Sequence, residues 1–454
     1  MRIRKKIRRV CAVVALSATF FTGCGGGKSP DLDTGFQADL PVVQSDGTEH
    51  PGQDGERITL TLGTVGNRNL QSVVDAYNRQ SEKYFVEIVD YLPEQYDNAV
   101  WEASADRFRM DVATGNGTDI IDLAELDTEV LGYRGILMDL EPFLEETQER
   151  YLTNILECLK TGDALYELGP SFALYTVVGN GTEVGMENGW TLEEMMKCFA
   201  DKGRDSNALT GFGSVCVSTA LTNYLLEDFI DWEKGEADFC KEEFYQILRF
   251  GAKWDAASVS RISAESVKSG THLAAMELIL SVAGYQQRMQ LFGGNMAVKG
   301  IPCNSGTGVA VSLYYEMGIN AHSECAEGAW DFLRFYTEGS WAEDDRTIIG
   351  FRIERSAFEK QLEQAMVQEY YEGSPLPKGS FDDPDVPYVY AATQEEVAAV
   401  RELVALADRK DAYNRIISNI IDEEVGAYNS GAQTVEQTAQ KIQNRVQLYL
   451  DEQR

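Results

Sequence analysis

The chain has 454 residues, of which 44% are hydrophobic, and its 73 acidic and 40 basic side chains give a formal net charge of −33. Residues 1–23 hold six cations and no acids, so 34 basic against 73 acidic residues remain beyond them, a charge of −39 that disfavours nucleic acids and anionic lipid headgroups as partners. Because a single hydrophobic core stops growing near ~250–300 residues, a chain of this length is expected to form two lobes.

The N-terminus has the organisation of an export signal. Residues 1–9 are basic, and residues 10–21 form an apolar run shorter than the ~20 residues that a membrane-spanning helix needs. Thr22-Gly23-Cys24 follows and resembles the bacterial lipobox, which implies cleavage before Cys24 and attachment of diacylglycerol to its sulfur. We therefore expect residues 1–23 to be a lipoprotein signal peptide; an ordinary signal peptide with an incidental cysteine is the alternative.

Residues 24–57 are expected to be the lipidated cysteine and a flexible tether. Positions 25–57 hold seven Gly and three Pro and show almost no apolar periodicity. A flexible chain of this length has a root-mean-square span of roughly 30 Å. Such a tether lets a folded body move above a membrane.

Strand and helix patterns alternate from residue 58 onward. Residues 58–62 and 86–91 and the short run 119–123 are apolar and predict strands. Between them, apolar residues spaced by three and four from Leu70 to Tyr77 predict a helix, and residues 98–113 predict a second one. This alternation predicts a parallel sheet covered by helices, whose ligands gather at the loops 64–69 and 124–128 beyond the strands' carboxyl ends.

The later part of the chain carries further helix signals. A threonine with Glu or Gln three residues on predicts a capping box at Thr191, Thr393 and Thr434. Apolar stripes predict helices around residues 416–421 and 439–450. The four prolines of residues 373–388 indicate a surface connection.

Cysteine and histidine give little sign of a metal site. Six cysteines remain beyond Cys24, none in a CxxC pair, and we expect free thiols rather than disulfides, although an exported protein could form long-range ones. Only His272 and His322 lie in the folded body, and there is no HExxH motif. We expect no metal and no cofactor.

Five segments from residue 58 to the C-terminus together resemble one known family. They are GTDIIDLA at 117–124, GILMDLEP at 135–142, GWTLEE at 189–194, GINAHS at 318–323 with AWDFL at 329–333, and IQNRV at 442–446. In this order they resemble the extracellular solute-binding lipoproteins of ABC importers, family 1, carbohydrate type, the group that includes maltose-binding protein. Each segment alone is weak evidence, and the combination behind a lipobox and a tether is strong.

The resemblance implies a periplasmic-binding-protein-like α/β fold: two α/β lobes with a hinge and a solute cleft between them. It places the N-lobe at 58–172 plus 305–365 and the C-lobe at 173–304 plus 366–454. It also implies a monomer, held to the extracytoplasmic face of the cell membrane by its lipid, that closes on a solute and delivers it to ABC permease subunits.

The resemblance also implies polar solute contacts in the loops between the lobes. Asn67 and Arg68 follow the first strand, where the family holds polar contacts, although Asn67 could instead cap the next helix. Glu125 follows the strand at 119–124, where the family presents polar groups; two residues earlier this chain has Leu123 in place of a stacking Trp, which argues against a maltodextrin. Ser171 and Phe172 lie at the first crossing between lobes, as solute contacts or as an apolar hinge wall.

Two aromatic residues are candidate stacking platforms for a sugar ring. Tyr285 follows the apolar run 273–283 at the place where the family has an aromatic platform; the alternative is a core tyrosine on the next helix. Trp232 lies in a turn with charged neighbours that is expected to be exposed.

Three functions compete on these grounds. The first is a non-catalytic importer subunit that captures a carbohydrate, expected to be an oligosaccharide. The second is a solute-binding lipoprotein for a non-sugar ligand such as a peptide. The third is an exported glycoside-acting enzyme, but no GxSxG, P-loop, GxGxxG or metal motif is present in the sequence, and we expect no catalysis.

Overall fold

The computed structural model describes residues 57–124, 126–144, 147–212, 215–254, 262–339, 341, 348–367, 390–411 and 413–452. The expected signal peptide, Cys24, nearly all of the tether, Glu125 and the proline-rich connection at 373–388 lie outside these residues. No helix in the described part is long and apolar enough to cross a membrane.

A four-stranded sheet in the order β11-β3-β1-β2 forms the centre of what we call the N-lobe. Its strands are β1 (Ile58–Thr64), β2 (Tyr84–Asp90), β3 (Ile120–Asp122) and β11 (Met317–Ile319). The pairing of β1 with β2 and β3 is parallel, as the alternation of strands and helices predicts, and β11 is antiparallel to β3.

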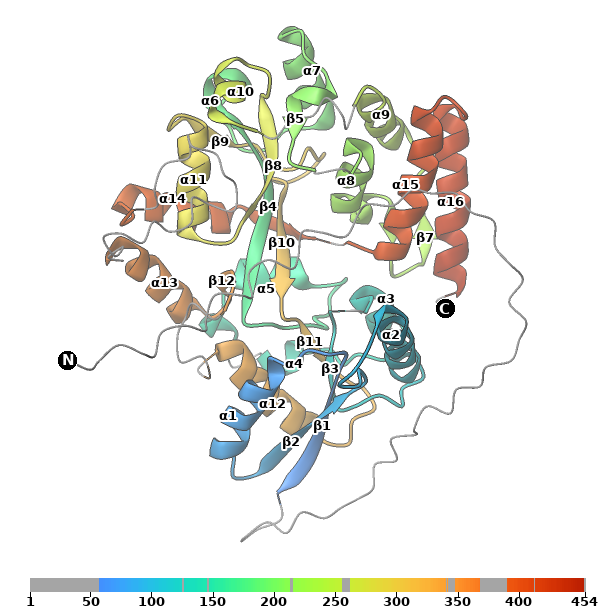
Figure 1. Ribbon diagram of the computed structural model, residues 1–454, viewed down its shortest axis with the longest axis vertical. Coiled ribbons are helices and arrows are strands. Elements are labelled where there is room, and N and C mark those ends of the chain that lie inside the picture. The colour runs from blue at the N-terminus through green and yellow to red at the C-terminus, as the bar shows by residue number, and fades with distance from the viewer. Residues whose placement is uncertain are drawn as a thin grey trace, which may run out of the picture. The chain divides into compact units, whose positions relative to one another are not determined.

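Helices cover this sheet as their apolar stripes require. Helix α1 buries Leu70, Val73, Val74 and Tyr77, the four residues of the predicted stripe, and α2 spans the predicted 98–113. The helices of this lobe are α1 (Leu70–Gln80), α2 (Asn98–Ala113), α3 (Thr128–Tyr133), α4 (Glu141–Leu144) and α12 (Ala326–Glu338). Helix α12 packs against α1, β1 and β11 (Figure 1).

A larger sheet in the order β13-β10-β4-β8-β5 forms the centre of the C-lobe, and β9 and β12 also pair with β4. Its strands are β4 (Ser171–Asn180), β5 (Leu209–Thr210), β8 (Ala274–Ile279), β9 (Met296–Val298), β10 (Val309–Tyr314), β12 (Phe351–Arg352) and β13 (Ala407–Lys410). A separate hairpin joins β6 (Ile230–Asp231) to β7 (Glu236–Ala237).

The C-lobe helices follow the predicted stripes and caps. They are α5 (Thr153–Leu159), α6 (Gly181–Val184), α7 (Leu192–Asp201), α8 (Val217–Tyr224), α9 (Glu242–Gly251), α10 (Ala264–Lys268), α11 (Val282–Leu291), α13 (Arg355–Val367), α14 (Gln394–Ala405), α15 (Arg415–Asn429) and α16 (Val435–Glu452). Capping boxes form at Thr191, Thr393 and Thr434 as predicted. Helices α15 and α16 pack side by side (Figure 1).

The chain crosses between the two sheets at two described places. Leu168 and Met317 exchange backbone hydrogen bonds of 3.0 and 2.9 Å, so the segment before β4 and the segment after β10 run together. Between β10 and β11, Tyr315 has a φ of 60°, a left-handed conformation that is uncommon for a bulky residue and that neighbouring structure must hold in place.

The sheets place residues 309–314 and residues 351–352 differently from the expected lobe division, since both segments pair with β4. The sequence places 305–365 in the N-lobe, but β10 pairs with β4 and β13 of the C-lobe sheet, and the chain joins the N-lobe sheet only at Met317. Likewise β4 begins at Ser171, two residues before the expected boundary. The strand partners that decide this lie more than 90 residues away, where periodicity carries no information.

Gly169 lies at the first crossing in a space that admits no side chain. A Cβ atom there would meet the backbone oxygen of Tyr314 at 2.5 Å and that of Tyr315 at 3.2 Å. We expect Gly169→Ala to lower the free energy of unfolding by about 1–3 kcal/mol, the usual cost of overpacking. Chemical denaturation followed by tryptophan fluorescence measures this loss.

Gly426 in α15 is the matched control, because a Cβ there meets nothing within 4 Å. Gly426→Ala is expected to raise the free energy of unfolding by roughly 0.5–1 kcal/mol, since alanine loses less backbone freedom than glycine in a helix. Equal stability of Gly169→Ala and the unmodified protein would contradict the crowding argument.

Candidate functional site

Two aspartates at the carboxyl ends of the N-lobe strands shape the loop after β1. Asp90 accepts hydrogen bonds from the backbone N–H of Gly66 at 2.7 Å and of Leu92 at 2.9 Å. Asp122 accepts from the hydroxyl of Thr64 at 2.7 Å and from the Asn67 side-chain amide at 3.1 Å. The carboxylates that fix the loop therefore lie on β2 and β3, the two strands that flank β1.

Asp122 is 6% exposed, and burial raises the pKa of its carboxyl. Hydrogen bonds from Thr64, Asn67 and the backbone of Ala124 favour the charged form and oppose that effect, while the charge of Asp90 adds to it. The carbonyl of Glu316, at the crossing after β10, accepts from the backbone N–H of Leu123 at 3.0 Å. This contact ties the end of β3 to the crossing.

Lys410, the last residue of β13 in the C-lobe, forms ion pairs with two acids, one in the N-lobe and one in the crossing segment before β4. Its ammonium group pairs with Glu129 of α3 and lies 2.6 Å from Glu167, which precedes β4. All three side chains are at least 85% buried. Burial lowers the pKa of Lys410, but the charges of Glu129 and Glu167 outweigh it and raise that pKa overall. Burial of Glu129 would raise the pKa of its carboxyl, but the charge and hydrogen bond of Lys410 outweigh burial and hold that pKa below its ordinary value.

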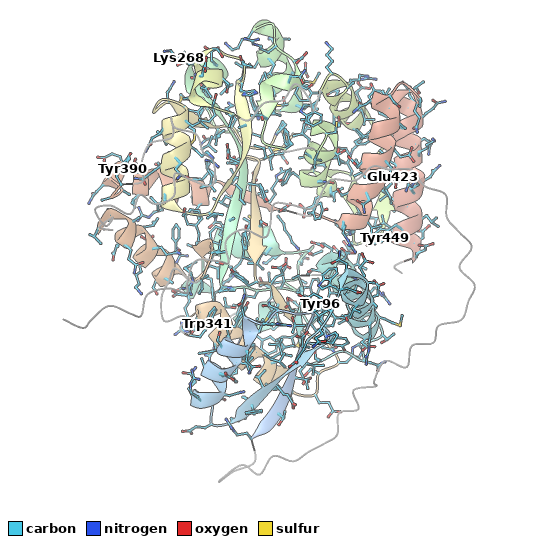
Figure 2. All side chains as sticks on the ribbon, viewed as in Figure 1. Tyr96, Lys268, Trp341, Tyr390, Glu423 and Tyr449 are labelled. Carbon is cyan, nitrogen blue, oxygen red and sulfur yellow. The ribbon has the colours of Figure 1, made fainter. Side chains whose placement is uncertain are left out.

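A second contact between the lobes involves the C-terminal helix. The hydroxyl of Tyr449 in α16 donates to Asp127, just before α3, at 2.7 Å, and Figure 2 labels Tyr449 at the end of α16. The side-chain amide of Asn414 donates to the same hydroxyl at 3.3 Å. Burial raises the pKa of Asp127, while the Tyr449 hydrogen bond works against that rise. The two contacts, at Lys410 and at Tyr449, both meet the N-lobe at α3.

Asp411, the residue after β13, lies beside β10, where its backbone N–H donates to the Val311 carbonyl at 2.8 Å. The rings of Tyr175 in β4 and Tyr224 at the end of α8 lie 5.1 Å apart. Burial raises the pKa of both tyrosines and of Tyr314 in β10, and the charge of Asp411 adds to the rise in each case. Burial raises the pKa of Asp411 to about 6, against a hydrogen bond from the Ser312 side chain.

Glu316 lies at the crossing between these groups. Burial, with the nearby charges of Glu167 and Asp122, raises its pKa from 4.5 to about 7. We call Asp122, Asp127, Glu129, Glu167, Glu316, Lys410 and Asp411 with Tyr175, Tyr224 and Tyr314 the inter-lobe cluster. Carboxylates, hydroxyls and flat rings are the kinds of group that form hydrogen bonds and ring-stacking contacts with polyhydroxylated molecules in general.

The raised pKa of Glu316 gives a sign for its effect on stability. Between pH 4.5 and about 7 the folded protein holds a proton on Glu316 that the unfolded chain releases, so this group's contribution to stability falls as pH rises through that window. Glu316→Gln removes the charge, and we expect it to raise the free energy of unfolding at pH 8 by up to about 3 kcal/mol, with no gain at pH 4.

Chemical denaturation at pH 4, 6 and 8 measures this effect, with Glu102→Gln on the exposed face of α2 as the control. A gain of the same size at all three pH values would contradict a titrating buried carboxyl at position 316.

The structure brings Asn67 to the cluster through its hydrogen bond to Asp122. The side chain of Arg68 is exposed and donates to the Glu94 carbonyl at 3.4 Å. Ser171 and Phe172 are fully buried at the start of β4; the Ser171 hydroxyl donates to the Ile349 carbonyl at 2.6 Å, and Phe172 packs against Phe351. Glu125 lies outside the described residues.

Trp232 lies in the turn between β6 and β7 and is half-buried against the C-lobe core. Its indole N–H has no hydrogen-bond acceptor in the described part of the chain. The flanking acids Asp231 and Glu233 contribute, after burial, to raising the pKa of Tyr133 at the end of α3 to about 12. The hairpin that carries Trp232 packs through β7 against α16, the helix that carries Tyr449.

Tyr285 lies on α11 and is 7% exposed within the hydrophobic core. Burial raises the pKa of its hydroxyl, and Glu396 and Glu402 of α14, a helix that packs against α11, add to the rise. A ring this buried offers a solute little surface in this conformation. Its role as a stacking platform stays a prediction.

Sequence reasoning missed most of the inter-lobe cluster. Glu167 and Glu316 each stand among apolar and aromatic residues, where an acid is unusual, and this was the signal in the sequence that could have pointed to them. No spacing rule joins Lys410 to Glu129, which lies 281 positions away.

Other features of the described residues do not join this cluster. A cavity of about 340 Å³ lies in the C-lobe between the starts of α7 and α9 and the segment 302–304, and none of the predicted site residues lines it. The six described cysteines are free thiols, and no group of three potential metal ligands occurs in the described ranges.

Two α/β lobes, each built on its own sheet and joined by crossing segments with polar residues gathered between them, define the fold of the periplasmic binding proteins. No family model and no curated protein matches the chain. Solved structures do: a putative oligosaccharide periplasmic-binding protein from Synechococcus (TM-score 0.53, 13% identity, covering 87% of this chain and 99% of that one) is similar over most of its length.

Two further structures show the same likeness. An oligogalacturonide-binding protein from Yersinia enterocolitica has a TM-score of 0.52 at 13% identity, and a family 1 extracellular solute-binding protein from Alicyclobacillus acidocaldarius has 0.50 at 14%. In both cases the match covers 87% of this chain and 100% of the other. Most of the similar structures are titled as binding proteins, and one, at TM-score 0.50, as a designed esterase. These likenesses confirm the predicted fold.

Proposed function

We propose that this protein is the extracellular substrate-binding subunit of an ABC importer, and that it captures a carbohydrate between its lobes. The observation that carries the proposal is the inter-lobe cluster, in which rings and hydrogen-bonding groups meet at the strand ends of a two-lobed binding fold. Tyr175, Tyr224 and Tyr314 offer flat surfaces, and Asn67, Asp122 and Asp411 offer acceptors and donors for hydroxyls.

The same arrangement supports binding by lobe closure. Lys410 and Tyr449 each contact the N-lobe from C-lobe elements, so a solute that adds further contacts to both lobes stabilises the closed arrangement. The similar structures include a putative oligosaccharide-binding protein and an oligogalacturonide-binding protein, which supports a saccharide as the solute class. A permease would recognise the closed form and receive the solute.

The solute class is tested by titrating the purified protein with mono- and oligosaccharides and with short peptides. A solute at 100 times its Kd stabilises the folded state by about 2.7 kcal/mol, so at least one saccharide should raise the melting temperature. A rise with peptides and none with any saccharide would overturn the carbohydrate assignment in favour of a non-sugar solute.

Tyr224→Ala tests whether solute binds at the cluster. Loss of a large aromatic anchor costs about 1–3 kcal/mol of binding free energy, so Kd should rise by roughly 5- to 150-fold. Isothermal calorimetry measures the change, with Tyr245→Ala as the matched control, a half-buried tyrosine of α9 that is not part of the cluster. Unchanged affinity in a folded Tyr224→Ala protein would place the solute elsewhere, for instance at Trp232 or Tyr285.

We also propose that Cys24 carries the lipid that holds this protein at the extracytoplasmic membrane face. The basic segment, the short apolar run and Thr22-Gly23-Cys24 support this assignment. Cys24→Ser should release the protein from membranes, because multiple acyl chains anchor a protein stably and a bare signal sequence is removed. Membrane and soluble fractions probed with an antibody measure the shift, and retention of the variant in the membrane fraction would refute lipidation at Cys24.

A further inference from the structure

Three consecutive residues at the start of α3 each contact a different segment outside the N-lobe sheet. These residues, which we call the α3 turn, are Asp127, Thr128 and Glu129. The first accepts a hydrogen bond from the hydroxyl of Tyr449 in α16 at 2.7 Å, and the second donates its hydroxyl to Glu167 in the crossing segment at 3.2 Å. The third forms an ion pair with Lys410 of β13. One helical turn therefore meets two elements of the C-lobe and the crossing between them.

Helix α3 is fixed to the N-lobe by its own packing. Its Leu131 is buried in a hydrophobic cluster with Ile121 and Leu123 at the end of β3, and the buried members of this cluster all lie between residues 108 and 137. The backbone N–H of Leu126 also donates to the Leu123 carbonyl at 2.9 Å. The α3 turn therefore moves together with the N-lobe sheet.

The partners of the α3 turn are held in place by the C-lobe. The ring of Tyr449 is buried in the C-lobe core, and the side-chain amide of Asn414 donates to its hydroxyl at 3.3 Å. The carbonyl oxygen of the same Asn414 side chain accepts from the backbone N–H of Ile417 at 2.9 Å and so caps α15. Lys410 belongs to β13, which pairs with β10. Both donors are thus positioned by C-lobe structure before they reach the N-lobe.

These contacts restrict the one motion that the crossings leave free. Lobes that are joined by a few crossing segments can rotate about them as about a hinge. A rotation that draws α3 away from α16 and β13 breaks the Tyr449 hydrogen bond and the Lys410 ion pair together. Both contacts involve a charged group in a largely buried place, where such interactions are stronger than neutral ones.

We propose that the α3 turn is a latch that keeps the two lobes together when no solute is bound, and that its release is the step that opens the protein. This inference goes beyond the proposed function, because it concerns the empty protein and applies to any solute. Each contact of the latch favours the arrangement described here over an open one. Loss of one hydrogen bond to a charged group should raise the ratio of open to latched molecules roughly 10- to 100-fold.

Variants that remove the contacts without leaving a buried unpaired charge test the proposal. Tyr449→Phe removes one hydroxyl, and Glu129→Gln together with Lys410→Met removes both charges of the ion pair. Small-angle X-ray scattering of the full-length protein without solute measures the radius of gyration. We expect a larger radius in the variant that combines all three substitutions, and an intermediate radius in Tyr449→Phe alone.

The matched control applies the same chemistry to a buried ion pair inside one lobe. Arg288 of α11 pairs with Glu277 of β8, and their side chains are 16% and 9% exposed. Glu277→Gln together with Arg288→Met should lower the melting temperature, because a buried ion pair is lost, and should leave the radius of gyration unchanged. This control separates opening of the lobes from general loosening of the fold.

The outcomes decide between a latch and an incidental contact. An unchanged radius in the folded combined variant, or an equal increase in the control variant, overturns the proposal. Should thermal melts show that the combined variant does not fold, Tyr449→Phe decides, since it lacks a single oxygen atom, and an unchanged radius in it overturns the proposal equally. No solute is present in these measurements, so their result leaves the carbohydrate assignment untouched.

Discussion

The ion pairs of Lys410 are the interaction on which the arrangement of the two lobes depends. One ammonium group at the end of β13 neutralises Glu129 of α3 and Glu167 before β4, so the C-lobe sheet, the N-lobe and the crossing meet at one atom. A buried pair of this kind adds little net stability relative to an apolar contact, but losing one partner leaves a buried charge uncompensated. We therefore interpret the role of Lys410 as fixing which surface of the N-lobe faces the C-lobe, rather than as adding stability.

The remaining acids explain why this region suits binding. Glu316 and Asp411 have raised pKa values because protein surrounds them and no cation pairs with either in the described structure. A folding core selected for stability alone would place apolar residues there. Buried polar groups lower stability, and so does a backbone conformation such as that of Tyr315, whose φ is 60°. Features of this kind are concentrated at functional sites.

Much of the fold could be predicted from the sequence because its signals are local. The stripe from Leu70 to Tyr77 lies within one helix, and the Thr191 capping box spans four residues, so each is decided by neighbours in the chain. The lobe division at β10 depends instead on pairing with β4 and β13. Tyr285 shows the same limit, since its burial results from α14, which begins 109 residues later at Gln394.

The candidate site was harder to predict than the fold, for a physical reason. Polar side chains follow no period, so an acid at position 129, 167 or 316 looks like any of the 73 acids until its partner is known. Asn67 could be found because it follows the first strand, where parallel sheets gather ligands. Lys410 could not, because its role depends on ion pairs with two acids that lie more than 240 residues away in the sequence.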